Sequence, residues 1–293
     1  DNDGSPSVIA FTAGSAVKPS NQGGGVHISE GGVVTRCLIQ NNGSRIGGGA
    51  YIENGMLGNS LILDNRSHYD REHPPGYFDV PSDGGGIYIQ GRGQLENCTV
   101  LNNRSSHTTG GVFWKSSFDP IDETVIRNNI LNSNSGFNLP VEAYVVTIEH
   151  NCIQDGTSLK DGNINSDPLV AEDYRLSESS PCRDTGTNQE WMTANGDYAG
   201  IKRVVNGDVD MGALEFVVPL IITQIQHTDE QVTLSWTSSP DAAYQLEETD
   251  DLSTNSWDKI GAVVTATGTV SSQTETVVPR FRHFYRCKHV LFE

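Results

Sequence analysis

The sequence predicts an all-β protein in which a parallel β-helix (a solenoid of stacked coils) is followed by a small antiparallel β-sandwich. Three observations lead to this fold class. A unit of glycines followed by a short apolar strand recurs in the first half of the chain, no coil contains a helical pattern of ten residues, and residues 217–293 alternate with a period of two. A repeat made of short strands without helices predicts stacked coils of β-structure.

The repeated unit is clearest at residues 84–103, where Gly-Gly-Gly-Ile-Tyr-Ile is followed by Asn-Cys-Thr-Val-Leu-Asn-Asn. Equivalent glycine runs begin at Gly23, Gly47 and Gly110. One position of the later strand aligns the coils, and it is occupied by Cys37, Ser60, Cys98, Asn129 and Cys152. The spacings of 23, 38, 31 and 23 residues indicate a coil of 23 residues with additions of 15 and 8 residues. In such a fold, equivalent strands pair about 4.8 Å apart, so that like residues stack.

Alternation within the first strand of each coil predicts which side chains enter the core. The two inward positions are filled by Val26, Ala50, Ile87 and Val112, and by Ile28, Ile52, Ile89 and Trp114. The position of Cys37 is expected to form a further inward stack. Asn tolerates the left-handed backbone that tight corners need, so the corners are assigned to Asn42, Asn65 and Asn103.

Three segments of different character divide the chain. Residues 1–157 hold the coils, and their start is expected to be truncated or processed because the chain opens inside a coil without a polar cap. Residues 158–216 are turn-rich and non-repeating, and they are expected to close the C-terminal end of the solenoid. Residues 217–293 are assigned to the sandwich, with Trp236 in its core.

The composition indicates an extracellular protein. With 37 Asp and Glu against 19 Lys and Arg, the net charge is −18, which argues against nucleic acid and anionic membranes as partners. No run of 18 apolar residues occurs, so no membrane span is expected. No motif requires a cofactor, although an acidic chain could bind Ca²⁺ through carboxylates. Asp197, Asp208 and Asp210 are the candidate ligands, with ordinary turn carboxylates as the alternative.

The five cysteines are divided between the coils and the two later segments. Cys37, Cys98 and Cys152 are expected to be buried as small apolar residues. Cys37 and Cys98 are separated by an intervening coil, too far apart for a bridge. A disulfide between Cys182 and Cys287 is an open alternative, and the odd count leaves at least one free thiol.

Each of these segments resembles a known family. The coil at residues 84–103 resembles those of the right-handed parallel β-helices of the pectate-lyase-like superfamily and is similar to the repeats of polymorphic outer-membrane proteins. Residues 167–215 resemble the closing region of bacterial choice-of-anchor Q proteins, through the motifs Asp-Pro-Leu, Ser-Pro-Cys-Arg-Asp-Thr-Gly and Val-Asp-Met-Gly-Ala-Leu-Glu. Residues 217–293 resemble a fibronectin-type-III-like module. The resemblance implies a secreted or cell-surface protein but no particular activity, because the superfamily holds lyases, glycosidases, adhesins and structural proteins.

The outward face of the first strand carries the candidate binding residues. One outward position holds an aromatic ladder of His27, Tyr51, Tyr88 and Phe113. The next outward position holds Ser29, Glu53, Gln90 and Lys115. Flat rings beside carboxylate, amide and ammonium groups can stack on a sugar chain and hydrogen-bond to it. The alternative is that the rings only stabilise the sheet through cross-strand contacts.

Two insertions interrupt the coils, at residues 66–83 and 116–123, and insertions in a solenoid often form its binding face. The first insertion could wall a groove beside the ladder with His68, Tyr69, Asp70, Arg71, His73 and Tyr77. Simple solvation of a charged loop is the alternative.

Three hypotheses about function follow. The first is a secreted module for binding a glycan on a polysaccharide or cell surface, for adhesion or for extracellular assembly. The second is a polysaccharide lyase or glycosidase that acts on an extracellular, uronic-acid type of polymer, with Glu53, Lys115 and the loop residues as acid, base and metal contacts. No outward position carries the Asp that the superfamily's polygalacturonases use, and no lyase motif is present. The third is a subunit of a filament or surface layer, because exposed coil ends can pair with another chain.

Overall fold

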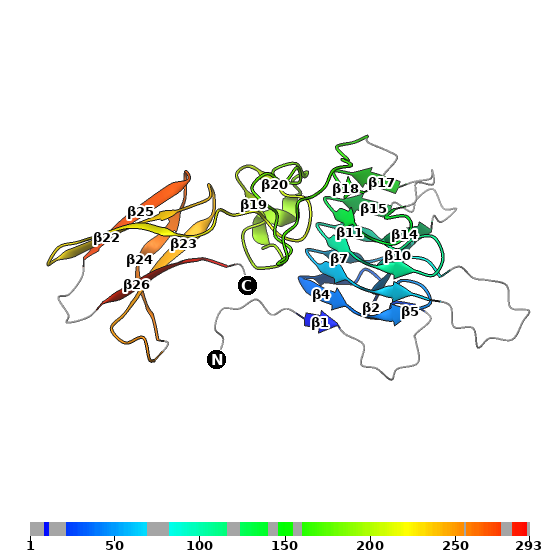
Figure 1. The fold of residues 1–293 in the computed structure, drawn as a ribbon, viewed down its shortest axis with the longest axis horizontal. Coiled ribbons are helices and arrows are strands. Elements are labelled where there is room, and N and C mark those ends of the chain that lie inside the picture. The colour runs from blue at the N-terminus through cyan, green and yellow to red at the C-terminus, as the bar shows by residue number, and fades with distance from the viewer. Residues whose placement is uncertain are drawn as a thin grey trace, which may run out of the picture.

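The computed structural model describes residues 22–68, 82–115, 124–139, 146–154, 160–254, 256–276 and 283–291, and the backbone of one further strand at residues 9–11. Along the longest axis of the molecule, the stacked coils are followed by the closing segment and then by the sandwich (Figure 1). The first part has parallel sheets and the last part has antiparallel sheets, which confirms the predicted fold class.

Three parallel sheets run along the stack of coils. Sheet 1 comprises β2 (Val26–Ser29), β6 (Ala50–Glu53), β10 (Ile87–Gln90) and β14 (Val112–Lys115). Sheet 2 comprises β3 (Val33–Thr35), β7 (Met56–Gly58), β11 (Gln94–Glu96), β15 (Thr124–Arg127) and β17 (Val146–Glu149). Sheet 3 comprises β1 (Ile9–Phe11), β4 (Cys37–Gln40), β8 (Leu61–Leu63), β12 (Thr99–Leu101), β16 (Ile130–Asn132) and β18 (Cys152–Ile153). A short fourth sheet comprises β5 (Gly43–Ser44), β9 (Arg66–Ser67) and β13 (Arg104–Ser105).

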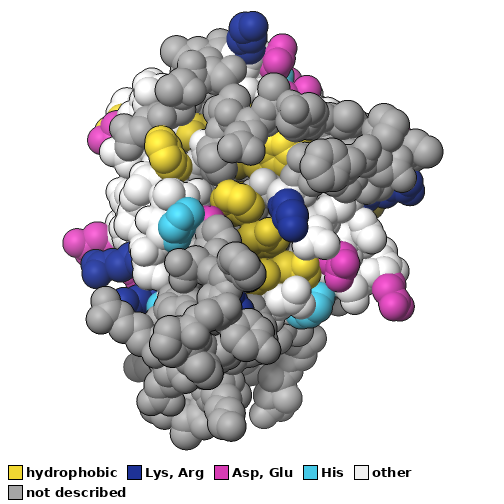
Figure 2. Space-filling model, turned by 90° about the vertical axis from the view of Figure 1, so that its right-hand side faces the viewer, with side chains coloured by type: hydrophobic (Ala, Val, Ile, Leu, Met, Phe, Trp, Pro, Cys, Tyr) yellow, Lys and Arg dark blue, Asp and Glu magenta, His cyan; other side chains and the backbone are white. Residues whose placement is uncertain are grey.

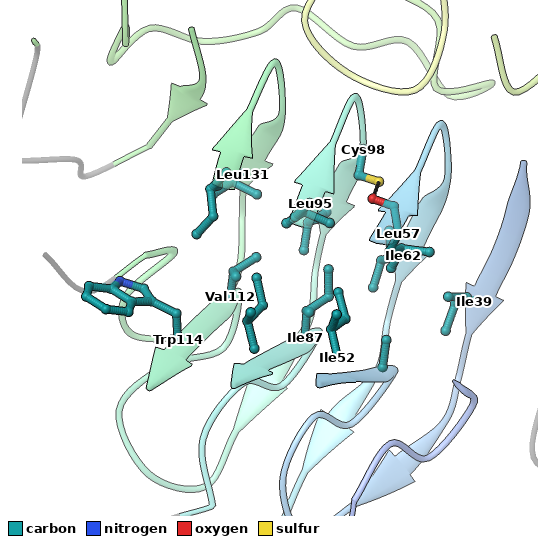
Figure 3. Close-up of a cluster of buried hydrophobic side chains, with 14 of the residues drawn as sticks. Ile39, Ile52, Leu57, Ile62, Ile87, Leu95, Cys98, Val112, Trp114 and Leu131 are labelled. Atoms are coloured by element: carbon teal, nitrogen blue, oxygen red, sulfur yellow. Dashed lines mark hydrogen bonds between the residues drawn. The ribbon is translucent and has the colours of Figure 1, made fainter. Parts of the chain in front are cut away.

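The strands pair in the register that the repeat predicts. Ile87 pairs with Ala50 in one neighbouring strand and with Val112 in the other. All eight residues assigned to the two inward positions of sheet 1 are buried, and all belong to one hydrophobic core. Side chains of sheets 2 and 3, among them Leu95 and Leu131, reach the same core (Figure 3). The repeat thus builds a single apolar column enclosed by three sheets.

The register of the last coil differs from the predicted alignment by one residue. Asn151, and not Cys152, follows Asn129 in the inward stack, and the backbone N–H of Asn129 donates to Asn151 Oδ1 at 2.9 Å. Cys152 instead pairs with Ile130. Neighbouring residues of a strand face opposite sides, so Cys152 is buried on the outward face of sheet 3 and not in the main core.

The coil corners use pairs of adjacent residues, which corrects the role predicted for Asn42, Asn65 and Asn103. The left-handed backbone belongs to the residue before each of them, with φ values of 58°, 54° and 59° at Asn41, Asp64 and Asn102. The predicted asparagines point inward and are 3% exposed or less. Their side chains form a ladder, in which the N–H of Asn65 donates to Asn103 Oδ1 at 2.9 Å.

The closing segment lies against the outward face of sheet 3. It contains the short 3-10 helix η1 (Glu190–Ala194) and the hairpin strands β19 (Val204–Val205) and β20 (Asp208–Val209). Leu176 and Met211 of this segment share a hydrophobic cluster with Leu61 and Ile130 of sheet 3. The sequence predicts a segment that closes the end of the solenoid, whereas the structure places it along the side of several coils. The strands of sheet 3 carry apolar side chains on both faces, so the outward face is also buried, against the closing segment.

The sandwich surrounds a core of its own. One antiparallel sheet comprises β21 (Ile222–His227), β22 (Gln231–Thr237) and β25 (Val270–Thr276). The other comprises β24 (Asp258–Thr265), β23 (Ala243–Thr249) and β26 (Phe284–His289). Trp236 is fully buried as predicted, with its ring centroid 6.0 Å from that of Tyr244. In the part of the chain that the structure describes, no helix has the length and apolar character needed to cross a membrane.

Candidate functional site

The four aromatic residues of sheet 1 form a continuous stack on the side opposite the core. They lie in register, one per coil. The ring centroids of Tyr51 and Tyr88 are 5.5 Å apart and nearly parallel, at 10°, and those of Tyr88 and Phe113 are 5.1 Å apart at 28°. His27 meets Tyr51 edge-on, at 4.9 Å and 74°. These distances are within the range of favourable aromatic pairs, so the ladder stabilises the sheet across coils.

The glycine runs before each strand make room for this stack. Gly23 and Gly47 have a left-handed backbone, with φ of 63° at both. A Cβ at Gly23 would stand 2.2 Å from the Val26 carbonyl oxygen and 3.1 Å from the Cβ of Tyr51. The glycines are therefore required both by the tight turn and by the close approach of the next ring.

The middle of the ladder is closed, which differs from the open stripe that the sequence suggests. Tyr51 is 1% exposed and Tyr88 is 8% exposed. Burial raises the pKa of Tyr88 to about 12, and the Tyr51 hydroxyl donates to Gln90 Oε1 at 2.8 Å. Access to the stack is through its two ends, because Phe113 is partly exposed and the His27 side chain is 42% exposed.

The second outward row stays accessible along its whole length. Ser29 and Lys115 are exposed at the two ends, and Glu53 and Gln90 are partly exposed between them. Glu53 Oε2 lies 4.0 Å from His27 Nε2. Figure 2 views the molecule from the side of Figure 1 where β2, β10 and β14 lie, and shows hydrophobic side chains in the middle of the surface with basic, acidic and histidine side chains beside them.

Of the predicted loop residues, only His68 is among those that the structure describes. The other five lie outside the described residues: Tyr69, Asp70, Arg71, His73 and Tyr77. The backbone N–H of His68 donates to the Ser44 carbonyl at 2.9 Å, so the coil register continues to this residue. At the other end of the insertion, the Ser82 carbonyl accepts from Ser67 Oγ at 2.9 Å, which ties the base of the insertion to the coil.

His68 belongs to a polar hollow of about 360 Å³ that sequence reasoning missed. Its lining is Asn41, Asn42, Gly43, Asp64, Arg66, His68 and Ser106. The hollow lies at the corner between sheet 3 and the short fourth sheet, where Arg66 also pairs in register with Arg104 of the next coil. The sequence signal was present in the Arg-Ser pairs that follow the corners at Asn65 and Asn103, but a spacing pattern cannot show that the corner is hollow.

A buried carboxylate paired with an accessible imidazole is the second feature that the sequence did not reveal. Asp83 is 2% exposed, and its Oδ1 and Oδ2 lie 3.1 and 3.0 Å from His107 Nδ1. Asp83 also accepts from the backbone N–H groups of Thr108 and Thr109, at 3.2 and 3.1 Å. The His107 side chain is 50% exposed. The carboxylate therefore orients the His107 ring through Nδ1. Nε2, on the opposite side of the ring, is the nitrogen that would act as a general base.

The acidic residues considered for Ca²⁺ do not converge on an empty site. Arg203, fully buried, lies among them, with Nη2 donating to the Asp210 carbonyl at 2.9 Å and Nε 3.3 Å from Glu215 Oε1. The Asp210 carboxylate accepts backbone N–H groups, and so does that of Asp197. Asp208 is exposed and accepts from Asn188 Nδ2 at 3.3 Å. Within the described ranges, no group of three or more His, Cys, Asp or Glu side chains is arranged to hold a metal ion.

Comparison of the chain with protein-family models and with curated proteins gives no match. The fold class therefore rests on the coils and their register, and membership of a particular β-helix superfamily stays a prediction from the repeated residues.

Proposed function

We propose that the chain is an extracellular, non-catalytic module that binds a polysaccharide along the outward face of sheet 1. The observation that supports the proposal is the register of that face. The same two outward positions recur in four successive strands, one coil apart, which is about 4.8 Å. A polymer with a short chemical repeat can contact such rows with several of its units at once, and linked contacts reinforce one another.

The chemistry of the accessible groups suits a sugar polymer. His27 and Phe113 present ring surface at the two ends of the stack, where a sugar face can lie against them. Lys115 is an exposed cation at one end of the polar row, and it can donate to a sugar hydroxyl or pair with a sugar carboxylate. Ser29 and Glu53 supply hydrogen-bonding groups for hydroxyls. The buried Tyr51 and Tyr88 hold the strands in register beneath these contacts.

The proposal is tested by titrating the full chain with neutral and uronic-acid polysaccharides and measuring affinity by calorimetry. Phe113→Ala and Lys115→Ala are each expected to weaken binding by about fivefold to tenfold. Lys259→Ala is the matched control, because Lys259 is an exposed strand lysine in the sandwich. Equal affinity of the wild type and all three variants for every polymer that binds would contradict the proposed face, and so would a wild type that binds none of the polymers.

A second function, cleavage of the same kind of polymer, is favoured by one observation, the contact between Asp83 and His107. A histidine whose Nδ1 is held by a buried carboxylate can accept a proton at Nε2 from a sugar carbon or from an attacking water. The assay follows the absorbance of unsaturated uronic-acid products with and without Ca²⁺, together with the release of reducing ends. His107→Gln should abolish product formation and leave polymer affinity unchanged. A wild type that forms no product would contradict catalysis and leave the binding proposal standing.

A further inference from the structure

Two cysteines from distant parts of the chain meet behind sheet 3. Cys152 belongs to β18 in the last coil, and Cys182 belongs to the closing segment. Both are fully buried, and both are members of the cluster that joins the closing segment to the coils. The two thiols are also close enough for each to perturb the pKa of the other, which falls for Cys152 and rises for Cys182. Neither the cysteine spacing nor the disulfide considered between Cys182 and Cys287 anticipates this contact, because it depends on the one-residue register of the last coil.

The backbone on both sides of the contact is held in place. The Cys152 N–H donates to the Asn129 carbonyl at 2.8 Å, as part of the parallel ladder, and its thiol reaches the Ser166 carbonyl at 3.2 Å. The Cys182 N–H donates to Ser180 Oγ at 3.1 Å, and its carbonyl accepts from the Met211 N–H at 2.9 Å. The fold therefore holds the backbone of each cysteine in place within the cluster that the two share.

The remaining cysteines have no comparable neighbour. Cys37 and Cys98 point into the main core from coils that are separated by the coil of Ser60, two steps of the ladder or about 10 Å apart. Cys287 lies against the sandwich core. All five cysteines are free in this structure. Any intramolecular bridge that keeps this fold is thus restricted to one pair.

We propose that Cys152 and Cys182 form a disulfide bond when the chain folds in an oxidising compartment, and that this bond fastens the closing segment to the last coil. The oxidant is a low-molecular-weight disulfide. One cysteine thiolate attacks it and releases one small thiol, and the second cysteine, after losing its proton, attacks the resulting mixed disulfide and releases another. Two protein thiols thereby lose two electrons and two protons, which leave in the two small thiols.

The oxidant must reach the two sulfur atoms for this exchange to take place. Because both thiols are inaccessible once the segment has docked, the exchange occurs before docking is complete, while the oxidant can still reach them.

The test begins with the full-length wild type, refolded from denaturant in a mixture of reduced and oxidised glutathione. The number of free thiols is expected to fall from five to three, with a mass loss of about 2 Da. Peptide mapping without reductant should show one linked pair of peptides, containing Cys152 and Cys182. Five free thiols under these conditions, or a bridge that includes any other cysteine, would overturn the proposal.

Variants then separate the bridge from general effects of cysteine removal. Cys152→Ser and Cys182→Ser should both lack the linked peptides and should melt at the same temperature with and without reductant. In the wild type, reductant should lower the melting temperature by roughly 5–10 °C, because the bridge closes a loop of about thirty residues. Cys98→Ser is the control, since Ser60 already occupies the equivalent position one coil away, and it should keep both the bridge and the reductant effect. If a serine variant does not fold, the peptide map of the wild type still decides the outcome.

Discussion

At each coil corner, two adjacent residues have separate tasks. The first takes the left-handed backbone and faces solvent or the turn, as Asn102 does with φ of 59°. The second points inward, as Asn103 does with no exposed surface. Its Oδ1 accepts from the backbone and side-chain nitrogens of Asn65 at 2.9 Å, and its Nδ2 donates to the carbonyls of Ile62 and Leu101. The amide thus satisfies backbone groups that the turn leaves without partners inside the coil.

Replacement of the inward asparagine should therefore be costly. Asn103→Ala leaves the Asn65 N–H and the Ile62 carbonyl buried without a partner, and we expect a loss of about 3 kcal/mol in the free energy of unfolding. Asn102→Ala is the matched control, because it changes the neighbouring exposed residue and only adds the cost of a left-handed alanine, about 1 kcal/mol. Urea unfolding monitored by circular dichroism measures both. Equal losses for the two variants would contradict the division of tasks at the corner.

Each strand of sheet 1 carries one aromatic ring that packs against the ring of the adjacent strand. The stack His27–Tyr51–Tyr88–Phe113 crosses four strands, and its two middle members are almost fully buried. The two central rings therefore stabilise the sheet by packing on the face opposite the hydrophobic core. Only its ends and the neighbouring polar row are placed to meet a ligand.

This division between centre and ends predicts different outcomes for stability and binding. Tyr88→Ala removes a ring that stacks on both neighbours, and we expect it to lower the free energy of unfolding by about 3–4 kcal/mol. Tyr88→Phe keeps the ring and should cost less than about 1 kcal/mol. Phe113→Ala, at the partly exposed end, should cost less than Tyr88→Ala and yet affect polymer binding. Equilibrium unfolding in urea compares the three, and a Tyr88→Ala variant as stable as the wild type would show that the ladder does not support the sheet.

The described residues form two units, each with its own core. The coils share one hydrophobic cluster with the closing segment, through Leu61 and Met211, so these two parts are expected to unfold together. The sandwich has its own cluster around Trp236 and Tyr244. The chain passes between them at residues 216–221, where the Val218 N–H donates to Ser239 Oγ at 2.8 Å.

The two units should respond to pH in opposite directions. Burial raises the pKa of Asp210, in the closing segment, from its ordinary 3.8 to about 6, and burial lowers the pKa of His289, in the sandwich, from 6.5 to about 4. A raised carboxyl pKa adds stability that is present below pH 4 and is lost as pH rises through 6, which for Asp210 amounts to about 3 kcal/mol. A lowered histidine pKa adds stability that is present above pH 6.5 and is lost as pH falls through 4.

The measurement compares each variant with the wild type at several pH values between 4 and 7. Asp210→Asn cannot ionise, so the wild type should lose stability relative to this variant as pH rises. His289→Gln has no titrating ring, so the wild type should gain stability relative to this variant over the same range. Tryptophan fluorescence during urea unfolding reports both transitions, because Trp236 belongs to the sandwich, and Trp114 and Trp191 belong to the other unit. Parallel pH profiles for the wild type and both variants would contradict these assignments.

Most of the fold could be predicted because its information is local and repeated. The glycine runs, the period of 23 residues and the alternation of apolar residues determine which strands stack and which side chains face the core, since every coil repeats the same geometry. The aromatic ladder follows from the same register. The repeat predicts that Cys152 points into the core, but the last coil is one residue shorter than the period. A shift of one residue moves each side chain of the following strand to the other face of the sheet, so Cys152 faces outward.

The candidate site and the contacts behind sheet 3 required the tertiary structure. Nothing local distinguishes an exposed ring from a covered one, and Tyr51 and Phe113 differ in exposure at equivalent positions of the repeat. Asp83 meets His107 one coil away, Arg203 lies among the carboxylates of a non-repeating segment, and Cys182 reaches Cys152 from that segment. In the coils, the constant rise of the repeat fixes which residues are adjacent. The closing segment has no repeat, so its contacts depend on where its apolar side chains can be buried against an exposed apolar face of a sheet.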